Sequence, residues 1–382
     1  MNGRWDFPAP VFVDDIVVAH AYGLTRQEFI DHARSVLPIG AGVAPELYRH
    51  LFITGALAFD RLGTQVPESN QKIWRQAFST ELLEPRRVVE EPLELGTTAK
   101  AIFATHDNYE VETVLIPMRY AGDGTVTAYT QCLSSQVGCR MGCTFCETGR
   151  MGLIRNLTAA EIVNQVVTAR VRLGWQAKNL VFMGMGEALD NWDELHQALL
   201  VLTDRSAFGF GQDAITICTS GHAEGIRKLM VLGWKRLNLS ISLNSAEDRA
   251  RSRMMPVNRS TGLAELQALL MSYRQRRNFV LGVNYCLIPG LNDSREDASR
   301  IAAFCAPLGR CMVNLIPYNP GSAPIARAPG EDEITGFIGW LREDGVSVRR
   351  RVTKGRSIMA ACGQLGNVGL RRKQITPAER PG

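Results

Sequence analysis

The sequence has little of what membrane, fibrous or disulfide-rich proteins need. No window of 18 consecutive residues is apolar, so no membrane-spanning helix is expected. The first ten residues, MNGRWDFPAP, hold an aspartate and two prolines where a secretory signal has an apolar run, which predicts a cytoplasmic protein. The nine cysteines are odd in number, which does not suit a disulfide framework and favours metal binding or catalysis.

What is present describes an ordinary globular chain. A length of 382 residues suffices for two or three domains with a sizeable core. With 45% hydrophobic and 21% charged residues, the composition excludes wholesale disorder, collagen-like repeats and a coiled-coil rod. The formal net charge of +5 is too small to predict a nucleic-acid partner without local clustering of the basic residues.

Residues 1–85 are predicted to form a small helical domain. Thr25 and Glu28 have the spacing of a capping box, and apolar residues recur behind them at helical intervals. The aromatic residues of this domain are interpreted as core rather than as a base-stacking surface. They are Tyr48, Phe52, Phe59, Trp74 and Phe78.

After residue 85 the pattern changes twice. Residues 86–131 alternate polar and apolar side chains between turn signals, which predicts an antiparallel β ribbon leading into Cys132. From there helical stretches separate apolar segments at 179–184, 214–220, 237–243, 279–288 and 312–318. Strands at this repeat predict right-handed βαβ units, and therefore an α/β fold with a parallel sheet or barrel.

Three cysteines stand close together in the stretch CRMGCTFC, at Cys139, Cys143 and Cys146. A structural zinc site normally has four protein ligands, often as two spaced pairs, and no second CxxC or suitable histidine pair accompanies these three. Three thiolates leave one coordination position of a metal centre open, and an open position marks a reactive centre. The stretch therefore favours a [4Fe–4S] cluster whose fourth iron has no cysteine ligand.

The last part of the sequence is strongly basic. Residues 349–374 contain eight lysines and arginines and no acidic residue. Such a run is more often a solvated face than a nucleic-acid site, so the charge pattern alone does not predict a partner. The basic residues are Arg349, Arg350, Arg351, Lys354, Arg356, Arg371, Arg372 and Lys373.

The cysteine stretch, with Phe145 directly before its last cysteine, resembles the signature of radical S-adenosylmethionine enzymes. More narrowly, the chain resembles the RlmN/Cfr family of RNA adenine methyltransferases over nearly its whole length. The stretches that carry the resemblance are 132–162, 184–191 (GMGEALDN), 313–320 (VNLIPYNP) and 360–365 (AACGQL). The resemblance implies a partial (β/α)6 barrel over residues 132–382 that holds a [4Fe–4S] cluster and S-adenosylmethionine.

The resemblance also implies a methyl relay through cysteine. Cys362 matches the methyl-carrying cysteine of the family, Cys132 its resolving cysteine, and Glu112 its catalytic acid/base. Carbons 2 and 8 of adenine are electron-poor and cannot attack an electrophilic methyl group, so Cys362 would receive the methyl first. A 5′-deoxyadenosyl radical would then activate this methyl for addition to the ring. Cys132 would finally release the product with formation of a disulfide bond.

A further set of residues matches the family's contacts with S-adenosylmethionine. The GMGE stretch lacks the third glycine and the spacing of a dinucleotide fingerprint, so a Rossmann site is excluded. The set comprises Gly186, Glu187, Cys218, Ser220, Ser242, Leu243, Asn244 and Asn314.

Three positions depart from the family pattern. The usual STSG begins here with Cys218, the usual SLH ends here with Asn244, and Met359 stands where an acidic residue is common. A thiol or an amide can still hydrogen-bond, so cofactor binding is expected to survive in a divergent family member. Outside such motif context, the thiols of Cys218, Cys286, Cys305 and Cys311 are interpreted as small buried hydrophobic groups.

Together these features predict a monomeric radical methyltransferase that acts on a ring carbon of adenosine, with carbon 2 favoured, in 23S rRNA or tRNA. The N-terminal domain and the basic tail would hold the RNA, and a flavodoxin or ferredoxin would supply electrons. The alternatives are a carbon 8 enzyme, a radical enzyme with a non-RNA substrate, and a non-enzymatic, zinc-stabilised RNA-binding module.

Overall fold

The computed structural model describes residues 12–13, 16–37, 40–273 and 276–366, and the chain divides into two compact units. The first unit comprises residues 1–83, 158–175 and 196–210, and the second comprises residues 84–157, 176–195 and 211–382. No helix among the described residues is long and apolar enough to cross a lipid bilayer.

The first unit is helical around an aromatic core. Two capping boxes are present, the one predicted at Thr25 and a second at Thr158, and each threonine accepts a hydrogen bond from the backbone of the third helical residue. The five aromatic residues predicted as core are buried, and Phe29 joins them with its ring centroid 4.3 Å from that of Phe78. The elements are β1 (Phe12–Val13), β2 (Ile16–Val17), β3 (Ala19–His20), α1 (Arg26–Val36), α2 (Ala44–Thr54), α3 (Glu68–Ala77), β4 (Phe78–Ser79) and α5 (Ala159–Leu173).

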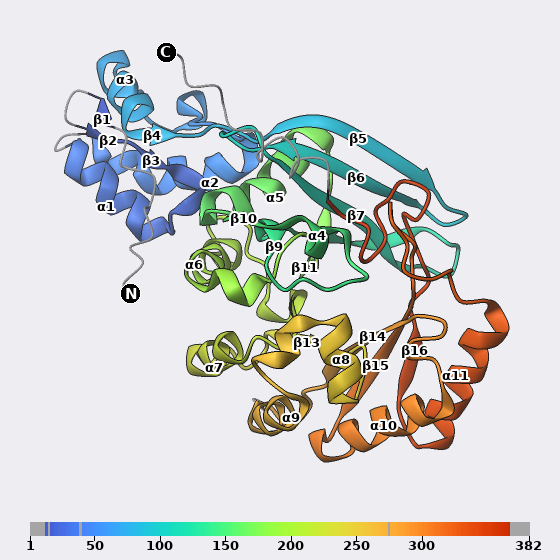
Figure 1. Ribbon diagram of the computed structural model, residues 1–382. Helices are drawn as coiled ribbons and strands as arrows, with labels where there is room; N and C mark the ends of the chain where they lie inside the picture. Colours follow the sequence, from blue (N-terminus) through green and yellow to red (C-terminus); the bar gives the residue numbers. More distant parts are fainter. Residues whose placement is uncertain (1–11, 14–15, 38–39, 274–275, 367–382) are drawn as a thin grey trace, which may run out of the picture. The chain divides into compact units, whose positions relative to one another are not determined.

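The second unit is built on one ten-stranded mixed sheet (Figure 1). Its order is β16-β15-β14-β13-β12-β11-β8-β7-β6-β5. Strand β8 pairs antiparallel with β7 and parallel with β11, so it joins an antiparallel ribbon to a parallel half-sheet. The strands are β5 (Glu84–Pro92), β6 (Thr97–Ala104), β7 (Glu110–Tyr120), β8 (Val126–Cys132), β11 (Ala177–Phe182), β12 (Ile215–Thr219), β13 (Asn238–Ser242), β14 (Leu281–Leu287), β15 (Cys311–Pro317) and β16 (Val348–Arg350).

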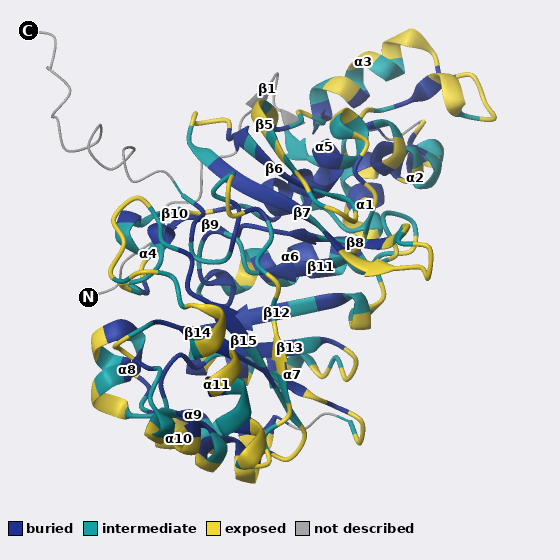
Figure 2. Ribbon diagram, turned by 90° about the vertical axis from the view of Figure 1, so that its right-hand side faces the viewer, coloured by how far each residue is buried: buried dark blue, intermediate teal, exposed yellow. Residues whose placement is uncertain are grey.

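The predicted α/β class and its antiparallel extension are confirmed. The edge strands β5 and β16 do not pair with each other, so the parallel strands form a partial rather than a closed barrel. Helices α7, α9, α10 and α11 lie along one side of these strands in Figure 1, and Figure 2 shows β12–β15 buried over much of their length. The helices are α4 (Glu147–Met151), α6 (Trp192–Thr203), α7 (Ala223–Leu232), α8 (Asp248–Met254), α9 (Leu263–Ser272), α10 (Arg295–Cys305) and α11 (Glu331–Glu343).

A small hairpin holds the cysteine stretch. Strands β9 (Gln136–Cys139) and β10 (Gly152–Asn156) pair antiparallel; Cys139 ends β9, and Cys143, Cys146 and α4 lie in the connection between the strands. Gly138 has a φ of +77°, and a Cβ added there would lie only 1.9 Å from the carbonyl oxygen of Gly152. Only glycine therefore lets the two strands cross closely enough to set the position of Cys139.

A buried arginine ties the ends of the parallel strands together. Arg251, at 1% exposure, donates from Nη2 to the carbonyl oxygens of Ser220 (2.7 Å) and Ser242 (3.1 Å) and from Nε to that of Leu243 (3.0 Å). Its Nη1 donates to Asn258 Oδ1 at 2.7 Å. Burial lowers the pKa of Arg251 to about 10, so the guanidinium is still charged at neutral pH. The planar fork thus fixes loops that the sequence places in the cofactor-binding set.

We expect Arg251→Met to lower the free energy of unfolding by about 2–4 kcal/mol, because several buried carbonyl oxygens lose their donor. Urea unfolding of purified protein would measure this loss. Arg253→Met is the matched control, since Arg253 lies exposed on the same helix and should change stability by less than about 0.5 kcal/mol. Equal effects of the two substitutions would contradict a tie specific to Arg251.

Candidate active site

The three cysteines predicted as metal ligands lie on one compact loop. Cys139 is the last residue of β9, and Cys146 directly precedes α4. The Cys146 amide donates to the Cys143 carbonyl oxygen at 3.2 Å, and the Thr144 amide donates to that of Met254 at 3.0 Å. The first bond closes the loop on itself, and the second holds it against Met254, the last residue of α8.

The thiols suit a polynuclear cluster better than a single zinc ion. Thiolates about 2.3 Å from a tetrahedral zinc ion lie about 3.8 Å from one another. Among the described residues, the three sulfur atoms do not form a group whose members all lie within 4.8 Å of one another. A [4Fe–4S] cluster binds each thiolate through a different iron and therefore suits a wider spacing. Burial raises the pKa of all three thiols, so a bound cation is needed to hold them as thiolates.

The glycines of the GMGE stretch pack against the protein's own backbone. A Cβ at Gly184 would lie 2.5 Å from the Leu133 carbonyl oxygen, and one at Gly186 would lie 2.6 Å from Gln136 Cβ. Gly186 also has a φ of +99°, which favours glycine. The two glycines thus let the segment that ends in Glu187 approach residues 133–136, which lead into the cysteine loop.

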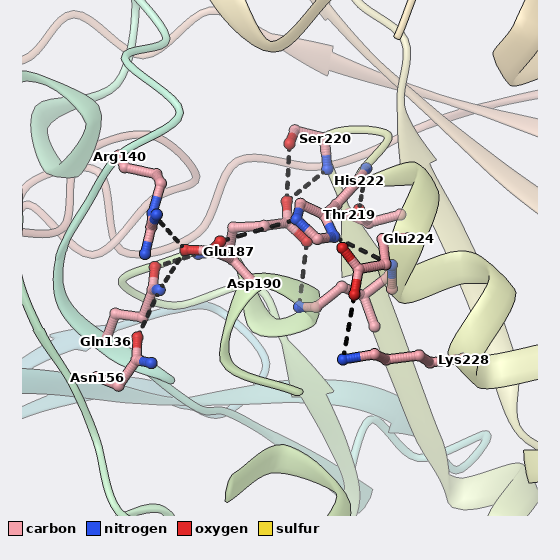
Figure 3. A network of polar contacts seen from close by, with 12 residues as sticks. Gln136, Arg140, Asn156, Glu187, Asp190, Thr219, Ser220, His222, Glu224 and Lys228 are labelled. Atoms are coloured by element: carbon pink, nitrogen blue, oxygen red, sulfur yellow. Dashed lines mark hydrogen bonds and ion pairs between the residues drawn. The ribbon is translucent and has the colours of Figure 1, made fainter. Parts of the chain in front are cut away.

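Glu187 and Ser220, both in the predicted cofactor-binding set, are in direct contact (Figure 3). Glu187 Oε2 accepts from the Ser220 amide at 2.7 Å and from its hydroxyl at 2.8 Å. Burial raises the pKa of Glu187, while the hydrogen bonds from Ser220 lower it. A buried carboxyl group therefore lies next to the cysteine loop, where a cationic amino group would be favoured.

A second set of polar residues in Figure 3 was not singled out from the sequence. Gln136 Nε2 donates to Asp190 Oδ2 at 2.8 Å, and Arg140, inside the cysteine stretch, contacts the same oxygen at 2.8 Å. The Glu187 amide donates to Gln136 Oε1 at 3.0 Å. These contacts join the cysteine loop to the segment after β11. The sequence does not reveal them, because isolated polar residues give no signal of which distant residues they bond.

Four of the remaining predicted cofactor residues belong to two strands: Ser242 ends β13, Leu243 and Asn244 follow it, and Asn314 lies in the middle of β15 rather than at its end. Asn244 has a φ of +57°, and its Oδ1 accepts from the Cys286 amide at 2.8 Å. Asparagine tolerates this left-handed backbone, so the departure from the family's histidine is structurally accommodated. Asn314 donates to Asn284 Oδ1 at 3.1 Å across the β14–β15 pair. Ser242 and Leu243 present their carbonyl oxygens to Arg251.

Three further cysteines gather on the inner side of the sheet. Cys132 ends β8, Cys218 lies on β12, and both belong to one buried apolar cluster. The Cys362 thiol lies 3.7 Å from Met183 Sδ, and Met183 packs against the same cluster. Arg351 Nη1 lies 3.3 Å from Met183 Sδ and 4.0 Å from Cys362 Sγ. A cation therefore adjoins a pocket of otherwise apolar groups and thiols.

The segment that carries Cys362 is bonded to the cysteine loop. The Glu147 amide, directly after Cys146, donates to the Gly363 carbonyl oxygen at 2.9 Å. Thr148 donates from its hydroxyl to the Leu365 carbonyl oxygen at 2.5 Å. Residues distant in sequence are thereby brought next to one another: the predicted iron ligands and the predicted methyl carrier.

Glu112 lies on β7 and is connected through Lys100 to the segment that carries Cys362. Its carboxylate is 3.4 Å from Lys100 Nζ, and both side chains are almost fully buried. Lys100 also donates to the Met359 carbonyl oxygen at 3.0 Å, which links the pair to the Cys362 segment. Burial raises the pKa of Glu112, and the Lys100 ammonium opposes that rise. Lys100 was not identified from the sequence, because nothing in a strand pattern distinguishes a buried lysine.

The described part of the basic run is largely occupied within the protein. Arg350 pairs with Glu331, with 2.7 Å between Nη2 and Oε1, Lys354 donates to the Tyr120 hydroxyl at 2.7 Å, and Arg351 faces the thiols. Arg349 and Arg356 are exposed. The remaining three, Arg371, Arg372 and Lys373, lie outside the described residues.

The expected disulfide bond is not found. All nine cysteines, Cys132 and Cys362 included, are free thiols. The fold does not depend on such a bond, because Cys132 is held by the sheet and Cys362 by the hydrogen bonds of its own segment.

Comparison with known proteins agrees with this arrangement. Residues 133–302 match the family model of the radical SAM superfamily. The "Probable dual-specificity RNA methyltransferase RlmN 1" of Protochlamydia amoebophila is 44% identical over 73% of this chain and 76% of its own length. The "Probable dual-specificity RNA methyltransferase RlmN" of Salinibacter ruber is 36% identical over 85% and 88% of the two chains.

A solved structure covers still more of the chain. The crystal structure of a radical SAM methyltransferase from Sphaerobacter thermophilus matches with a TM-score of 0.80 and 33% identity, over 90% of this chain and 98% of its own. At this identity and coverage the likeness extends beyond the fold. The chain therefore belongs to the RlmN/Cfr-type family of radical S-adenosylmethionine RNA methyltransferases.

Proposed function

We propose that this chain methylates a ring carbon of adenosine, carbon 2 in the first place, in 23S rRNA or tRNA through a methyl-cysteine intermediate. The observation that carries the proposal is the pair of hydrogen bonds between α4 and the Cys362 segment. They bring a lone cysteine beside three cysteines suited to a metal cluster. A cysteine with only a structural role would not need to lie beside cysteines that can bind a metal cluster.

Cys139, Cys143 and Cys146 would hold a [4Fe–4S] cluster. Glu187 would accept from the amino group of S-adenosylmethionine. Ser220 directly after β12, Ser242 at the end of β13 and Asn314 in the middle of β15 would supply further contacts. When bound, these groups would supply the methyl group and the carbon radical that the reaction needs, and the cluster would take up the one electron left over when the radical adduct loses its proton. The neighbouring Met254, Met255 and Tyr318 are buried beside Cys143 and Phe145 and would exclude water from that side.

Three residues of the chain carry out the remaining steps, which are methyl transfer, proton removal and product release. Cys362 carries the methyl carbon to the adenine ring. Glu112 takes the proton from the substituted ring carbon, since a carboxylate with a raised pKa is a competent base. The Cys132 sulfur attacks Cys362 Sγ, so that an S–S bond forms while the bond from Cys362 to the methylene carbon breaks. The electron pair of that bond stays with the carbon, which takes a proton and becomes the methyl group.

The wider setting follows from the same chemistry. We infer a cytoplasmic, monomeric enzyme whose cluster is reduced by a flavodoxin or ferredoxin. Exposed Arg349 and Arg356 are the described residues of the basic run that remain available to RNA phosphates. The C-terminal residues Arg371–Lys373 extend this proposed contact.

Cells that lack the gene, complemented with the wild-type chain or with Cys362→Ala, test the function directly. We expect 2-methyladenosine in RNA only with the wild type, because the variant has no group to receive the methyl. Mass spectrometry of digested 23S rRNA and tRNA measures the nucleoside. A signal for 8-methyladenosine would reassign the ring carbon, and the absence of any new methyladenosine would favour a non-RNA substrate. Methylation by Cys362→Ala would end the relay mechanism.

Cys143→Ala should remove the cluster, because two thiolates cannot replace three. Anaerobic reconstitution with iron and sulfide should give a broad visible absorption band in the wild type and none in the variant. Formation of 5′-deoxyadenosine should be lost in parallel. Cys311→Ala is the matched control, since Cys311 lies at the start of β15 and should retain both signals. Zinc in the purified wild type without iron uptake would favour the zinc-stabilised module.

Lys100→Met should shift the acid limb of the pH–rate profile to higher pH. Glu112 must be charged to act as a base, burial already raises its pKa, and loss of the Lys100 ammonium removes a group that lowers it. Single-turnover methylation measured from pH 5.5 to 9 with enzyme in excess over RNA would reveal the shift, since the chemical step is then observed. Lys178→Met, at an exposed position, should leave the profile in place. An unshifted limb in Lys100→Met would argue against Glu112 as the base.

A further inference from the structure

Cys218 shares the pocket of the two relay cysteines. It is 8% exposed and belongs to the same buried apolar cluster as Cys132, with Met183 packed against that cluster. The strand register pairs Phe182 of β11 with Ile217 of β12, so the next residues along the two strands, Met183 and Cys218, are neighbours. The Cys362 thiol in turn lies 3.7 Å from Met183 Sδ. Cys218 and Cys362 therefore adjoin the same side chain.

The sheet order separates Cys218 from Cys132. They lie on β12 and β8, with β11 between them, and Cys132 is level with Thr216 rather than with Cys218, so their backbones are more than about 10 Å apart at the usual strand and residue spacings. A disulfide needs Cα atoms within about 7 Å, so these two cysteines do not suit direct pairing. Cys362 comes from a separate segment and contacts Met183 on the intervening strand. It can thus be approached by Cys132 from one strand and by Cys218 from the other.

The other thiols of the second unit are less well placed. Cys286 packs with Cys143 and Phe145 on the side of the proposed cluster. Cys305 and Cys311 adjoin each other at the end of α10 and the start of β15. Only Cys218 lies in one apolar cluster with Cys132 among the described cysteines. A structural role alone would be served by the serine that the family usually has at this position.

We propose that Cys218 is a second resolving thiol, which releases methylated product from Cys362 when Cys132 does not. This inference rests on the proposed methyl relay. The Cys218 sulfur attacks Cys362 Sγ, an S–S bond forms, and the bond from Cys362 to the methylene carbon breaks. The two sulfurs are each oxidised by one electron, and the pair passes to the carbon. The Cys218 thiol loses its proton and the methylene carbon gains one, so the step needs no further oxidant or reductant.

The first test needs no RNA. Reconstituted Cys132→Ala enzyme is treated anaerobically with diamide, and its disulfides are mapped by peptide mass spectrometry while the visible band reports cluster retention. We expect a Cys218–Cys362 disulfide, its loss in Cys132→Ala/Cys218→Ser, and its presence in the matched control Cys132→Ala/Cys311→Ser. A failure to find it in Cys132→Ala enzyme that retains its cluster would overturn the proposal.

The second test follows release during one turnover with S-adenosylmethionine and RNA. Cys132→Ala should form a slow-migrating, nuclease-sensitive protein–RNA band on a denaturing gel, and this band should decay as methylated RNA and the Cys218–Cys362 disulfide appear. In Cys132→Ala/Cys218→Ser the band should persist, with decay at least about tenfold slower. Equal decay in the two variants would overturn the proposal even if diamide forms the disulfide. A lack of both band and methylated RNA in all variants and in the wild type would instead overturn the methyl relay, and with it this role of Cys218.

Discussion

The site depends on the close approach of two backbone segments, residues 133–136 and 183–187. The Gly184 amide donates to the Leu133 carbonyl oxygen at 3.0 Å, and the Ser135 amide donates to that of Met185 at 2.8 Å. No side chain fits between them at the two glycines. Because one segment leads from Cys132 into the cysteine loop and the other ends in Glu187, this contact fixes the predicted iron ligands, Glu187 and the proposed resolving thiol relative to one another.

Burial gives that frame its chemical character. Burial raises the pKa values of the Cys132 thiol, Glu187 and Glu112, and the nearby cations are few and specifically placed. Lys100 faces Glu112, and Arg351 faces Cys362. In a low-dielectric site each such cation has a larger effect than it would in water. Glu112 and the Cys362 thiol therefore each have a separate neighbouring cation, Lys100 and Arg351 respectively.

The sequence predicts the parts of this site that rest on local pattern. Capping boxes, strand periodicity and the cysteine spacing are short-range signals, and the helical unit, the mixed sheet and the cysteine loop follow from them. Arg251, Lys100 and Gln136 act through contacts between residues far apart in the chain, so no window around them reveals their partners. The basic run shows the same limit. Its charge pattern does not reveal that Arg350, Arg351 and Lys354 have partners within the fold.

Cys218 has a thiol where the family usually has a serine hydroxyl, and this thiol differs in reactivity between the resting enzyme and product release. Burial raises the pKa of Cys218 to about 12, so at pH 7 only about one molecule in 10⁵ holds it as thiolate. An isolated attack by such a thiol is slow, so coupling to Cys362 in the resting enzyme needs an added thiol oxidant such as diamide. Product release differs because the methylene carbon gains a proton as the thiol loses one. The step then creates no net charge in an apolar cluster, and the Arg351 guanidinium stabilises the thiolate as it forms. Burial therefore hinders stray chemistry at Cys218 more than it hinders release.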